Sequence, residues 1–248
     1  MDVREQLCYT DSYARSVEAR VADVDDGGEA PLIVLDRTVF YPGGGGQPAD
    51  RGLLLRTTDG RTWTVTRARK AGGDIVHELE PSPDGPPARD DLVMVDLDWA
   101  RRYALMRTHT ALHVLCGVIW NEWGVPVTGG NMEPLTARMD FELDPNPEGF
   151  GARVEELVAA EIAADRPIEV SFIPRAEAVL DEALIRTKIS LVPTSVPEIR
   201  VVDIVGLDKQ ADGGTHVRST AEVGGVRVVK TQSKGKGNKR VRIEVTDG

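Results

Sequence analysis

Short runs rich in apolar residues, separated by clusters of Gly, Asp and Pro, dominate the N-terminal part of the chain. They cover residues 16–24, 32–35, 63–68 and 92–97. Runs of this length between turn residues are typical of β-strands, and about six of them predict a small β-barrel or sandwich. The stretch 80–91 holds four prolines and three aspartates and is predicted to be a loop near the end of this unit.

The pattern changes at Asp98, after which apolar positions recur at spacings of four and three as far as Trp123. Residues 99–123 contain no proline and one glycine, so this stripe predicts one long amphipathic helix. Asp98 is suited to cap the N-terminus of that helix. The stripe consists of Leu105, His109, Leu112, Cys116, Ile119 and Trp123.

Shorter elements are predicted after this helix. A second helix begins at Pro147, is capped by Asn146 and ends before Pro167. Strands are predicted at 168–173 and 199–205, a short helix at 177–185, and two or more strands at 222–245 joined by Ser-Lys-Gly-Lys-Gly-Asn. The predicted fold class is α+β: a small β-barrel over residues 1–97 and an α+β domain over residues 98–248, with the long helix packed on an antiparallel sheet.

Composition narrows the class of protein. The 248 residues are 41% hydrophobic and carry a net charge of −10, which argues against coating of nucleic acid but allows a local basic face. The cysteines, Cys8 and Cys116, are far apart and form no CxxC motif, which favours a reducing compartment. The first ten residues contain no apolar run, and no stretch approaches the length of a membrane span. We expect a cytoplasmic protein.

Three of the four histidines lie in two short motifs, His109-Thr-Ala-Leu-His113 and Asp212-Gly-Gly-Thr-His216. On a helix, side chains four residues apart share one face, so the first pair is able to grip a single metal ion. The two motifs together offer four donors, the number that a closed zinc site requires. A zinc-dependent hydrolytic site is therefore the first hypothesis. It is not an HExxH site, because Thr110 follows the first histidine.

Each motif also has a simpler interpretation. His109 in an apolar stripe can be a hydrogen-bonded core residue, and a Gly-rich turn can carry Asp212 and His216 incidentally. Cys116 lies one turn beyond His113, and we interpret it as a small buried hydrophobic residue. The combination of motifs favours the metal site, because this concentration of histidines is not expected by chance in a chain that has four.

A glycine-rich segment forms the third motif, Phe40-Tyr-Pro-Gly-Gly-Gly-Gly-Gln47-Pro-Ala-Asp50-Arg-Gly52. Four consecutive glycines, Gly43, Gly44, Gly45 and Gly46, are entropically costly unless the backbone must be unusual, and their N–H groups could form an anion-binding nest. The segment is neither a P-loop nor a dinucleotide fingerprint, because it lacks Gly-Lys-Ser/Thr and a βαβ context. The alternative is a flexible hairpin loop.

These motifs resemble the editing domain of alanyl-tRNA synthetase, and most closely its free-standing AlaX trans-editing relatives of the medium-length type. HTALH, GGTHV, the glycine-rich run and the ending SKGKGNKRVRIE carry the resemblance, which spans the whole chain in family order. It implies an aminoacyl-tRNA deacylase that hydrolyses Ser-tRNA(Ala), and often Gly-tRNA(Ala), with zinc held by His109, His113 and His216. Asp212 stands where the family usually has cysteine, and we expect it to be the fourth ligand or to leave that position to water or Gln210.

The resemblance also places Thr38 and Gln47 in the amino-acid pocket, and the predicted catalytic residues are these two with His109 and His113. A hydroxyl at Thr38 that bonds the seryl side chain would be left unpaired by alanine, which would supply discrimination. The alternative is that Thr38 is an ordinary β-strand residue.

Contacts to tRNA are predicted at the C-terminal end of the chain. Residues 218–245 hold eight Lys or Arg and two Glu, a local excess of positive charge. We expect Lys234, Lys236, Lys239 and Arg240 to form a phosphate clamp, extended by Arg101, Arg102 and Arg107 on the long helix. Two rival functions remain open: a metal-dependent hydrolase of another aminoacyl-tRNA or ester, and a non-catalytic tRNA-binding module whose metal site has decayed.

Overall fold

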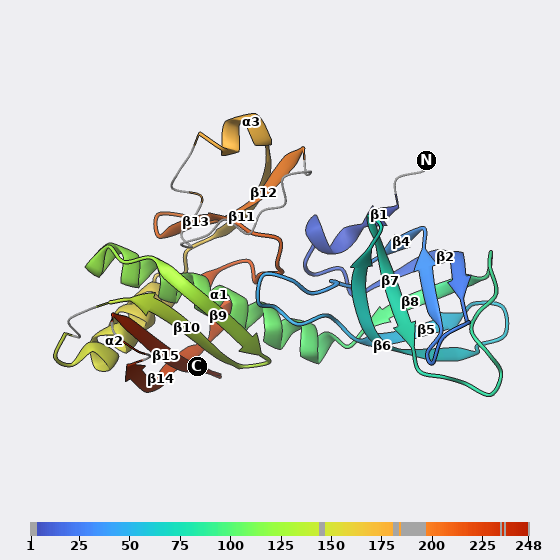
Figure 1. Ribbon diagram of the computed structural model, residues 1–248, viewed down its shortest axis with the longest axis horizontal. Helices are drawn as coiled ribbons and strands as arrows, with labels where there is room; N and C mark the ends of the chain where they lie inside the picture. Colours follow the sequence, from blue (N-terminus) through green and yellow to red (C-terminus); the bar gives the residue numbers. More distant parts are fainter. Residues whose placement is uncertain are drawn as a thin grey trace. The chain divides into compact units, whose positions relative to one another are not determined.

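The computed structural model describes residues 4–143, 147–180, 184, 197–233, 235 and 237–247. The chain forms two compact units (Figure 1). The first consists of residues 1–44 and 48–103, and the second of residues 45–47 and 104–248. The predicted α+β class is confirmed, since a barrel, one long helix and further antiparallel sheets are all present.

The first unit is built around a closed antiparallel barrel with the strand order β2-β3-β7-β6-β5-β8. Its strands are β2 (Ser16–Asp25), β3 (Leu32–Leu35), β5 (Gly52–Arg56), β6 (Thr62–Ala71), β7 (Asp74–Leu79) and β8 (Leu92–Leu97). Alternate residues of each strand fill the interior, and Val65, Val93 and Val95 are fully buried. Two short strands, β1 (Glu5–Gln6) and β4 (Arg37–Thr38), pair in parallel outside the barrel. The barrel alternative of the sequence prediction is therefore correct.

A buried ion pair holds the start and end of the glycine-rich segment together. Arg102 and Asp50 are 0% and 1% exposed, and the guanidinium also donates to the backbone oxygens of Val39 and Ser12. The Asp50 carboxylate accepts the Tyr41 N–H at 2.6 Å. The expectation that Arg102 contacts phosphate is wrong, because a fully buried guanidinium is satisfied by its own unit.

His77, the histidine outside the two motifs, is buried in the barrel unit. Its Nδ1 lies 3.3 Å from the Ile33 oxygen, which can only accept, so Nδ1 carries the proton and Nε2 accepts the Thr38 hydroxyl at 2.8 Å. Burial lowers the pKa of His77 to about 4. The imidazole is therefore neutral in the folded protein at pH 7.

We predict that His77 makes the barrel unit less stable in acid. Its folded pKa lies below the unfolded value of about 6.5, so the unfolded chain binds the proton first. The contribution of neutral His77 to the free energy of unfolding is fully present above pH ~6.5 and falls by up to about 3 kcal/mol as the pH drops toward ~4. Urea unfolding at pH 7 and pH 5 measures this loss. His77→Gln should show a smaller loss between the two pH values than the wild type, and an equal loss would contradict the assignment.

The second unit contains most of the long helix α1 (Trp99–Trp123), whose bounds match the prediction. Asp98 Oδ1 accepts the Arg101 N–H at 3.1 Å, which is the predicted cap. Antiparallel strands in the order β14-β15-β10-β9 form the main sheet: β9 (Val127–Glu133), β10 (Thr136–Glu142), β14 (Gly225–Ser233) and β15 (Asn238–Thr246). The Thr108 hydroxyl of α1 accepts the Leu135 N–H at 2.9 Å, and Figure 1 shows the helix behind this sheet.

A second sheet of three strands completes this unit, in the order β11-β12-β13. It consists of β11 (Ile168–Pro174), β12 (Glu198–Ile204) and β13 (Asp208–Ala211), with a 3-10 turn at Thr220–Val223. Gly117 lets α1 approach the turn before β13, since a Cβ there would lie 2.8 Å from Leu207 Cγ. Among the described residues, no helix is long and apolar enough to cross a membrane.

The second helix begins later than predicted. α2 covers Phe150–Ala163, and Gly149 precedes it with φ 68°, a left-handed conformation that excludes a helix starting at Pro147. The predicted cap Asn146 lies outside the described residues. α3 covers Arg175–Ala178 and overlaps the predicted helix at 177–185 only at Glu177 and Ala178. Most of the remainder of that predicted helix lies outside the described residues.

Candidate metal centre

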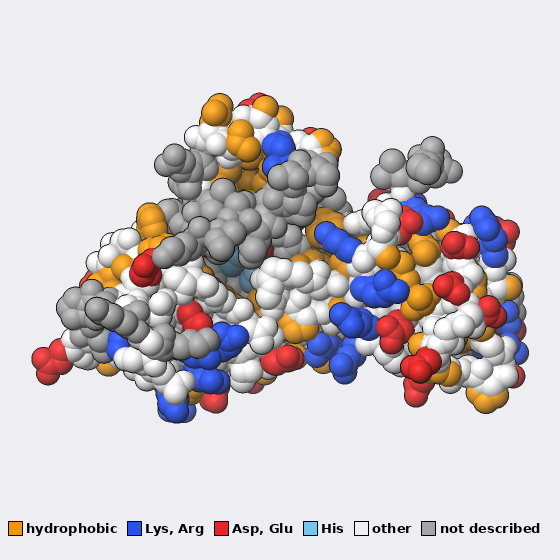
Figure 2. Space-filling model, viewed as in Figure 1, with side chains coloured by type: hydrophobic (Ala, Val, Ile, Leu, Met, Phe, Trp, Pro, Cys, Tyr) orange, Lys and Arg blue, Asp and Glu red, His pale blue; other side chains and the backbone are white. Residues whose placement is uncertain are grey.

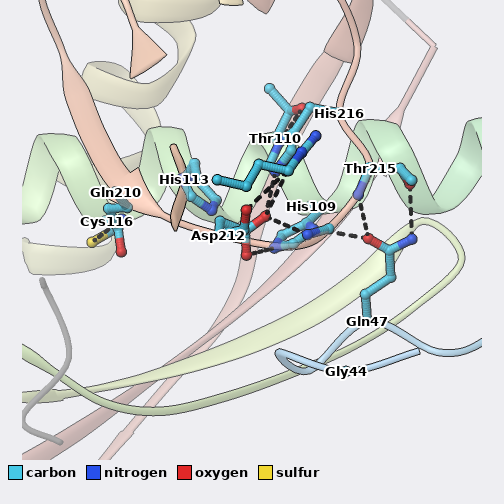
Figure 3. A network of polar contacts seen from close by, with 12 residues as sticks. Gly44, Gln47, His109, Thr110, His113, Cys116, Gln210, Asp212, Thr215 and His216 are labelled. Atoms are coloured by element: carbon cyan, nitrogen blue, oxygen red, sulfur yellow. Dashed lines mark hydrogen bonds and ion pairs between the residues drawn. The ribbon is translucent and has the colours of Figure 1, made fainter. Parts of the chain in front are cut away.

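Four potential metal ligands converge in the second unit (Figure 3). His109 and His113 come from adjacent turns of α1, and Asp212 and His216 come from the loop after β13. Each offers one ligand atom, and all four atoms lie within 4.8 Å of one another. The three histidine side chains are 1–7% exposed, whereas Asp212 is 12% exposed. Of the four side chains, Asp212 is therefore the most accessible to solvent.

Close backbone approach shapes the loop that carries Asp212 and His216. A Cβ on Gly214 would lie 2.1 Å from His109 Cε1 and 2.8 Å from Gln47 Oε1. Only glycine lets the backbone pass this close to the imidazole. The Gly214 N–H donates to Asp212 Oδ2 at 2.6 Å, which turns the carboxylate back toward the helix.

Gln47 determines the tautomer of His109. The Thr215 N–H can only donate, and it lies 3.0 Å from Gln47 Oε1, so this oxygen is the acceptor. The Gln47 amide nitrogen donates to the Thr215 hydroxyl at 2.8 Å, which agrees with that orientation. His109 Nδ1, 2.9 Å from the same oxygen, must therefore carry its proton. The lone pair of Nε2 is left for the cluster.

The other two imidazoles are oriented in the same manner. His113 Nδ1 lies 3.1 Å from Asp208 Oδ2, an acceptor that also binds the Gln210 amide at 2.6 Å. His216 Nδ1 lies 3.1 Å from the Thr110 hydroxyl, and its Nε2 lies 3.1 Å from Asp212 Oδ2. Outer partners that bind Nδ1 and leave Nε2 as the ligand atom are a regular feature of histidine metal sites.

Burial and neighbouring charges set the protonation of the cluster. Burial lowers the pKa of His216 to about 4 and that of His109 well below its ordinary value, so both are neutral at pH 7. Burial also opposes a charge on His113, but the bond to the Asp208 carboxylate raises its pKa. Burial favours a protonated Asp212, yet the surrounding imidazoles hold the pKa of this carboxyl well below its usual range.

The donor set fits a divalent metal ion. With Nδ1 protonated, the Nε2 lone pair of His109 points toward the ionised Asp212 carboxylate, whose Oδ1 lies 3.6 Å away. Such atoms repel one another unless a cation lies between them. Three imidazoles and a carboxylate form a workable tetrahedral zinc set. Arg200 supports Asp212 from the protein side by donating to its backbone oxygen at 3.0 Å.

We predict that Asp208 tunes metal affinity through His113. Asp208→Asn keeps the shape but removes the carboxylate that orients Nδ1–H, and removal of such a partner typically weakens metal binding by about 10–100-fold. Competition with a chelating dye measures the affinity. Asp203→Asn, which removes the same charge from β12, is the control and should leave affinity unchanged; equal effects would argue against an orienting role.

Two further candidate ligands lie apart from the cluster. Cys116 Sγ is 3.4 Å from the Gln210 amide nitrogen, and that nitrogen also binds Asp208. Figure 3 shows both side chains one turn of α1 beyond His113. The interpretation of Cys116 as a small buried residue agrees with this position, and Gln210 is engaged in orienting Asp208 rather than approaching the ligand atoms.

The predicted pocket residues fall in both units. Gln47 contacts the cluster directly, as described. Thr38 belongs to the barrel unit, is 3% exposed, accepts the Phe40 N–H and donates to His77, so its role in a pocket remains a prediction. All four glycines of the run have positive φ, between 58° and 132°, as the entropy argument requires.

Three of the predicted tRNA contacts, Arg107, Lys239 and Arg240, are engaged within the protein. Arg107 donates to the backbone oxygens of Val223 and Thr246 and to Asp247. Arg240 makes two bonds of 2.7 Å to Asp140, and Lys239 donates to Ser233 at 2.6 Å. Lys234 and Lys236 lie outside the described residues. The phosphate clamp therefore remains a prediction.

Sequence reasoning missed the outer partners of the ligands, which are Asp208, Thr110 and Thr215. Thr110 lies inside the HTALH motif, where its position between two ligands was a usable signal. Asp208 is 95 residues from His113, and nothing in the sequence links the two.

Comparison with known proteins gives the class to which this fold and site belong. Residues 199–242, which include Asp212 and His216, match the family model "Threonyl and Alanyl tRNA synthetase second additional domain". Residues 8–101, the barrel unit, match the model "tRNA synthetases class II (A)". Both units therefore resemble parts of aminoacyl-tRNA synthetases.

Full-length relatives make the assignment specific. The chain is 39% identical over 248 residues to the alanyl-tRNA editing protein AlaX-M of Methanosarcina barkeri, covering 98% of this chain and 99% of that protein. It is 36% identical to AlaX-M of Saccharolobus solfataricus, over 97% of this chain and 98% of that protein. The alanine–tRNA ligase of Pyrobaculum neutrophilum is 38% identical over 234 residues, but only 25% of that longer protein is covered. The chain belongs to the AlaX-M family of alanyl-tRNA editing proteins.

Proposed function

We propose that this protein is a cytoplasmic trans-editing deacylase that hydrolyses the aminoacyl ester of Ser-tRNA(Ala), and also of Gly-tRNA(Ala). The observation that supports this most is the arrangement of three imidazoles by Gln47, Asp208 and Thr110, which brings one ligand atom from each of them and from Asp212 within 4.8 Å of one another. Proteins named for alanyl-tRNA editing cover nearly the whole chain, which gives the substrate class.

The metal in this proposal is zinc, held by His109, His113 and His216 with Asp212 as fourth ligand. Zinc bound there would supply Lewis acidity, either to the attacking water or as an anchor for the substrate amine. The carboxylate makes the donor set harder than the usual one with cysteine, because oxygen is a less polarizable donor than sulfur. The exposed edge at Asp212 is the side from which the ester reaches the cluster.

In this proposal Gln47 orients a ligand of the cluster, and Thr38 discriminates between substrates. Gln47 holds His109 in one tautomer, and its carbonyl oxygen is fully used by His109 and Thr215. Thr38 donates its hydroxyl proton to His77, so it can meet a seryl hydroxyl only as an acceptor. A bond of this kind rejects alanine, which has no hydroxyl to donate.

Comparison of three substrates tests the proposed function. Ser-tRNA(Ala) and Gly-tRNA(Ala) should be deacylated by the zinc-loaded protein, while Ala-tRNA(Ala) should react at least about 100-fold more slowly. Equal rates for all three, or faster hydrolysis of an unrelated aminoacyl-tRNA, would favour the rival hydrolase. Binding of tRNA without any deacylation would favour a module whose metal site has decayed.

A further inference from the structure

A row of polar side chains crosses the outer face of the main sheet. In the strand register, Asn131 of β9 lies opposite Arg138 of β10, Arg138 opposite Arg242 of β15, and Arg242 opposite Lys230 of β14. The row, here called the basic row, consists of Asn131, Arg138, Arg242 and Lys230. Three cations thus stand on neighbouring strands although their positions in the sequence are far apart.

The basic row lies on the face of the sheet that faces away from α1 and α2. The intervening residues Ala137, Met139, Val241 and Ile243 are buried, whereas Arg242 and Lys230 are exposed. On the opposite face, Gly151 of α2 approaches Thr231, whose neighbour Lys230 points the other way. Figure 2 shows blue side chains gathered over β10, β14 and β15, with part of the histidine cluster on the same side of this unit.

A β-bulge keeps Lys230 in the row. The register of β14 against β15 shifts between Val228 and Lys230, so that Val229 is an extra residue. In a regular strand Val229 would lie opposite Arg242, and Lys230 would point to the other face of the sheet, because side chains alternate with a period of two. The backbone irregularity therefore adds a third cation beside Arg242.

This arrangement costs stability in the free protein. Like charges directly opposite each other on neighbouring strands are destabilising. Arg138 has a partial partner in Asp140 at 3.4 Å, and Arg242 bonds the Gln232 amide oxygen at 3.4 Å. In the part of the chain that the structure describes, no ion pair joins Arg242 or Lys230 to a carboxylate. Glu133 and Glu244 follow in the next row, which limits the positive charge to a narrow band.

The basic row ends beside the metal centre. Its last strand, β9, is an edge of the sheet, and a Cβ on Gly46 would lie 3.8 Å from Gly130 O in that strand. The next residue, Gln47, is the one that holds His109. The row spans about 14 Å at the usual strand spacing, and its β9 end is the one nearest the cluster.

We propose that the basic row binds the phosphate backbone of the tRNA acceptor arm and leads the 3′ end to the histidine cluster. The partner follows from the proposed function, on which this inference rests, and from the chemistry of the row. Lys230 and Arg242 are exposed, and Arg138 is half-buried beside Asp140. Such cations release counterions when they bind a polyanion, which offsets the repulsion between them. The chain as a whole is acidic, with a net charge of −10, so this basic face is a local exception to its overall charge.

Binding of uncharged tRNA(Ala), followed by fluorescence anisotropy over a range of salt concentrations, tests the proposal. The variant Arg138→Gln/Arg242→Gln/Lys230→Gln should bind at least about tenfold more weakly than the wild type, with a salt slope lower by about 2–3. The matched control Arg67→Gln/Arg69→Gln/Lys70→Gln removes three charges from β6 of the barrel and should behave as the wild type. Equal losses in both variants, or none in the first, would overturn the proposal.

Two further readouts separate this inference from unfolding and from the proposed function. Thermal unfolding of the first variant should occur at the wild-type temperature or above, because repulsion has been removed. In deacylation of Ser-tRNA(Ala) it should show a raised KM with kcat retained. If the wild type deacylates Ser-tRNA(Ala) and the variant binds tRNA as well as the wild type does, the role of the basic row is rejected and the proposed function stands. If the variant loses tRNA binding but the wild type shows no deacylation, the hydrolytic function is rejected and the basic row stands.

Discussion

Gly214→Ala is expected to remove metal binding and to slow Ser-tRNA(Ala) deacylation by at least about 100-fold. The added methyl group would lie 2.1 Å from His109 Cε1 and 2.2 Å from Nδ1, distances that no side chain can adopt. Either His109 leaves the cluster or the loop moves outward and takes Asp212 and His216 with it. Metal content and single-turnover rates measure the two losses together.

Gly28→Ala is the control for this substitution. Gly28 has its nearest contact at 3.7 Å, an ordinary van der Waals distance, and lies in a loop of the barrel unit. We expect wild-type metal content and rate in this variant. A Gly214→Ala protein that kept its metal and its rate would show that the close approach of this loop to His109 is not required.

His113→Ala is expected to lower deacylation by at least about a thousandfold, because it removes one of the three proposed imidazole ligands and the imidazole that Asp208 holds. The same variant should lose its metal in equilibrium dialysis. Its fold should be retained above pH 6, where circular dichroism can verify it.

His77→Ala serves as the comparison for His113→Ala. This histidine is as deeply buried as the ligands but belongs to the barrel unit. Its loss should lower stability while metal content stays at the wild-type level. If His113→Ala and the wild type deacylate Ser-tRNA(Ala) at equal rates, the assignment of the centre is wrong.

Local patterns predicted the elements that carry the ligands. The stripe from Leu105 to Trp123 and the cap at Asp98 gave the bounds of α1, because helix periodicity and capping depend on neighbours in the sequence. The spacing of His109 and His113 placed both on one face for the same reason. The start of α2 was misjudged, because the left-handed conformation at Gly149 prevailed over the preference of Pro147 for a first helical turn.

Long-range pairings could not be predicted in this way. Asp208 reaches His113, and Gln47 reaches His109 and Thr215, through tertiary packing that no local pattern encodes. Arg102 looked like a surface residue of an amphipathic helix, yet its burial depends on Asp50, fifty-two residues away. The basic row likewise cannot be found before the strand register is known, because it joins four strands and depends on a single bulge.

Asp212 is the residue in which this chain differs most from the motif it resembles. Its carboxylate is held by the Gly214 N–H and supported by Arg200, and it stands within reach of all three imidazoles. In the proposed centre, the exchange of a thiolate for a carboxylate would therefore retain a fourth donor and leave no cysteine among the ligands. Asp212→Cys is a compatible substitution for testing how far the harder ligand sets metal preference.

The rate of Ser-tRNA(Ala) deacylation by metal-stripped protein, before and after zinc is returned, tests the central claim most directly. The stripped protein should show a negligible rate, and the full rate should return as zinc approaches a single equivalent per chain. A stripped protein that contains no metal by elemental analysis and still deacylates Ser-tRNA(Ala) at the full rate would contradict this claim.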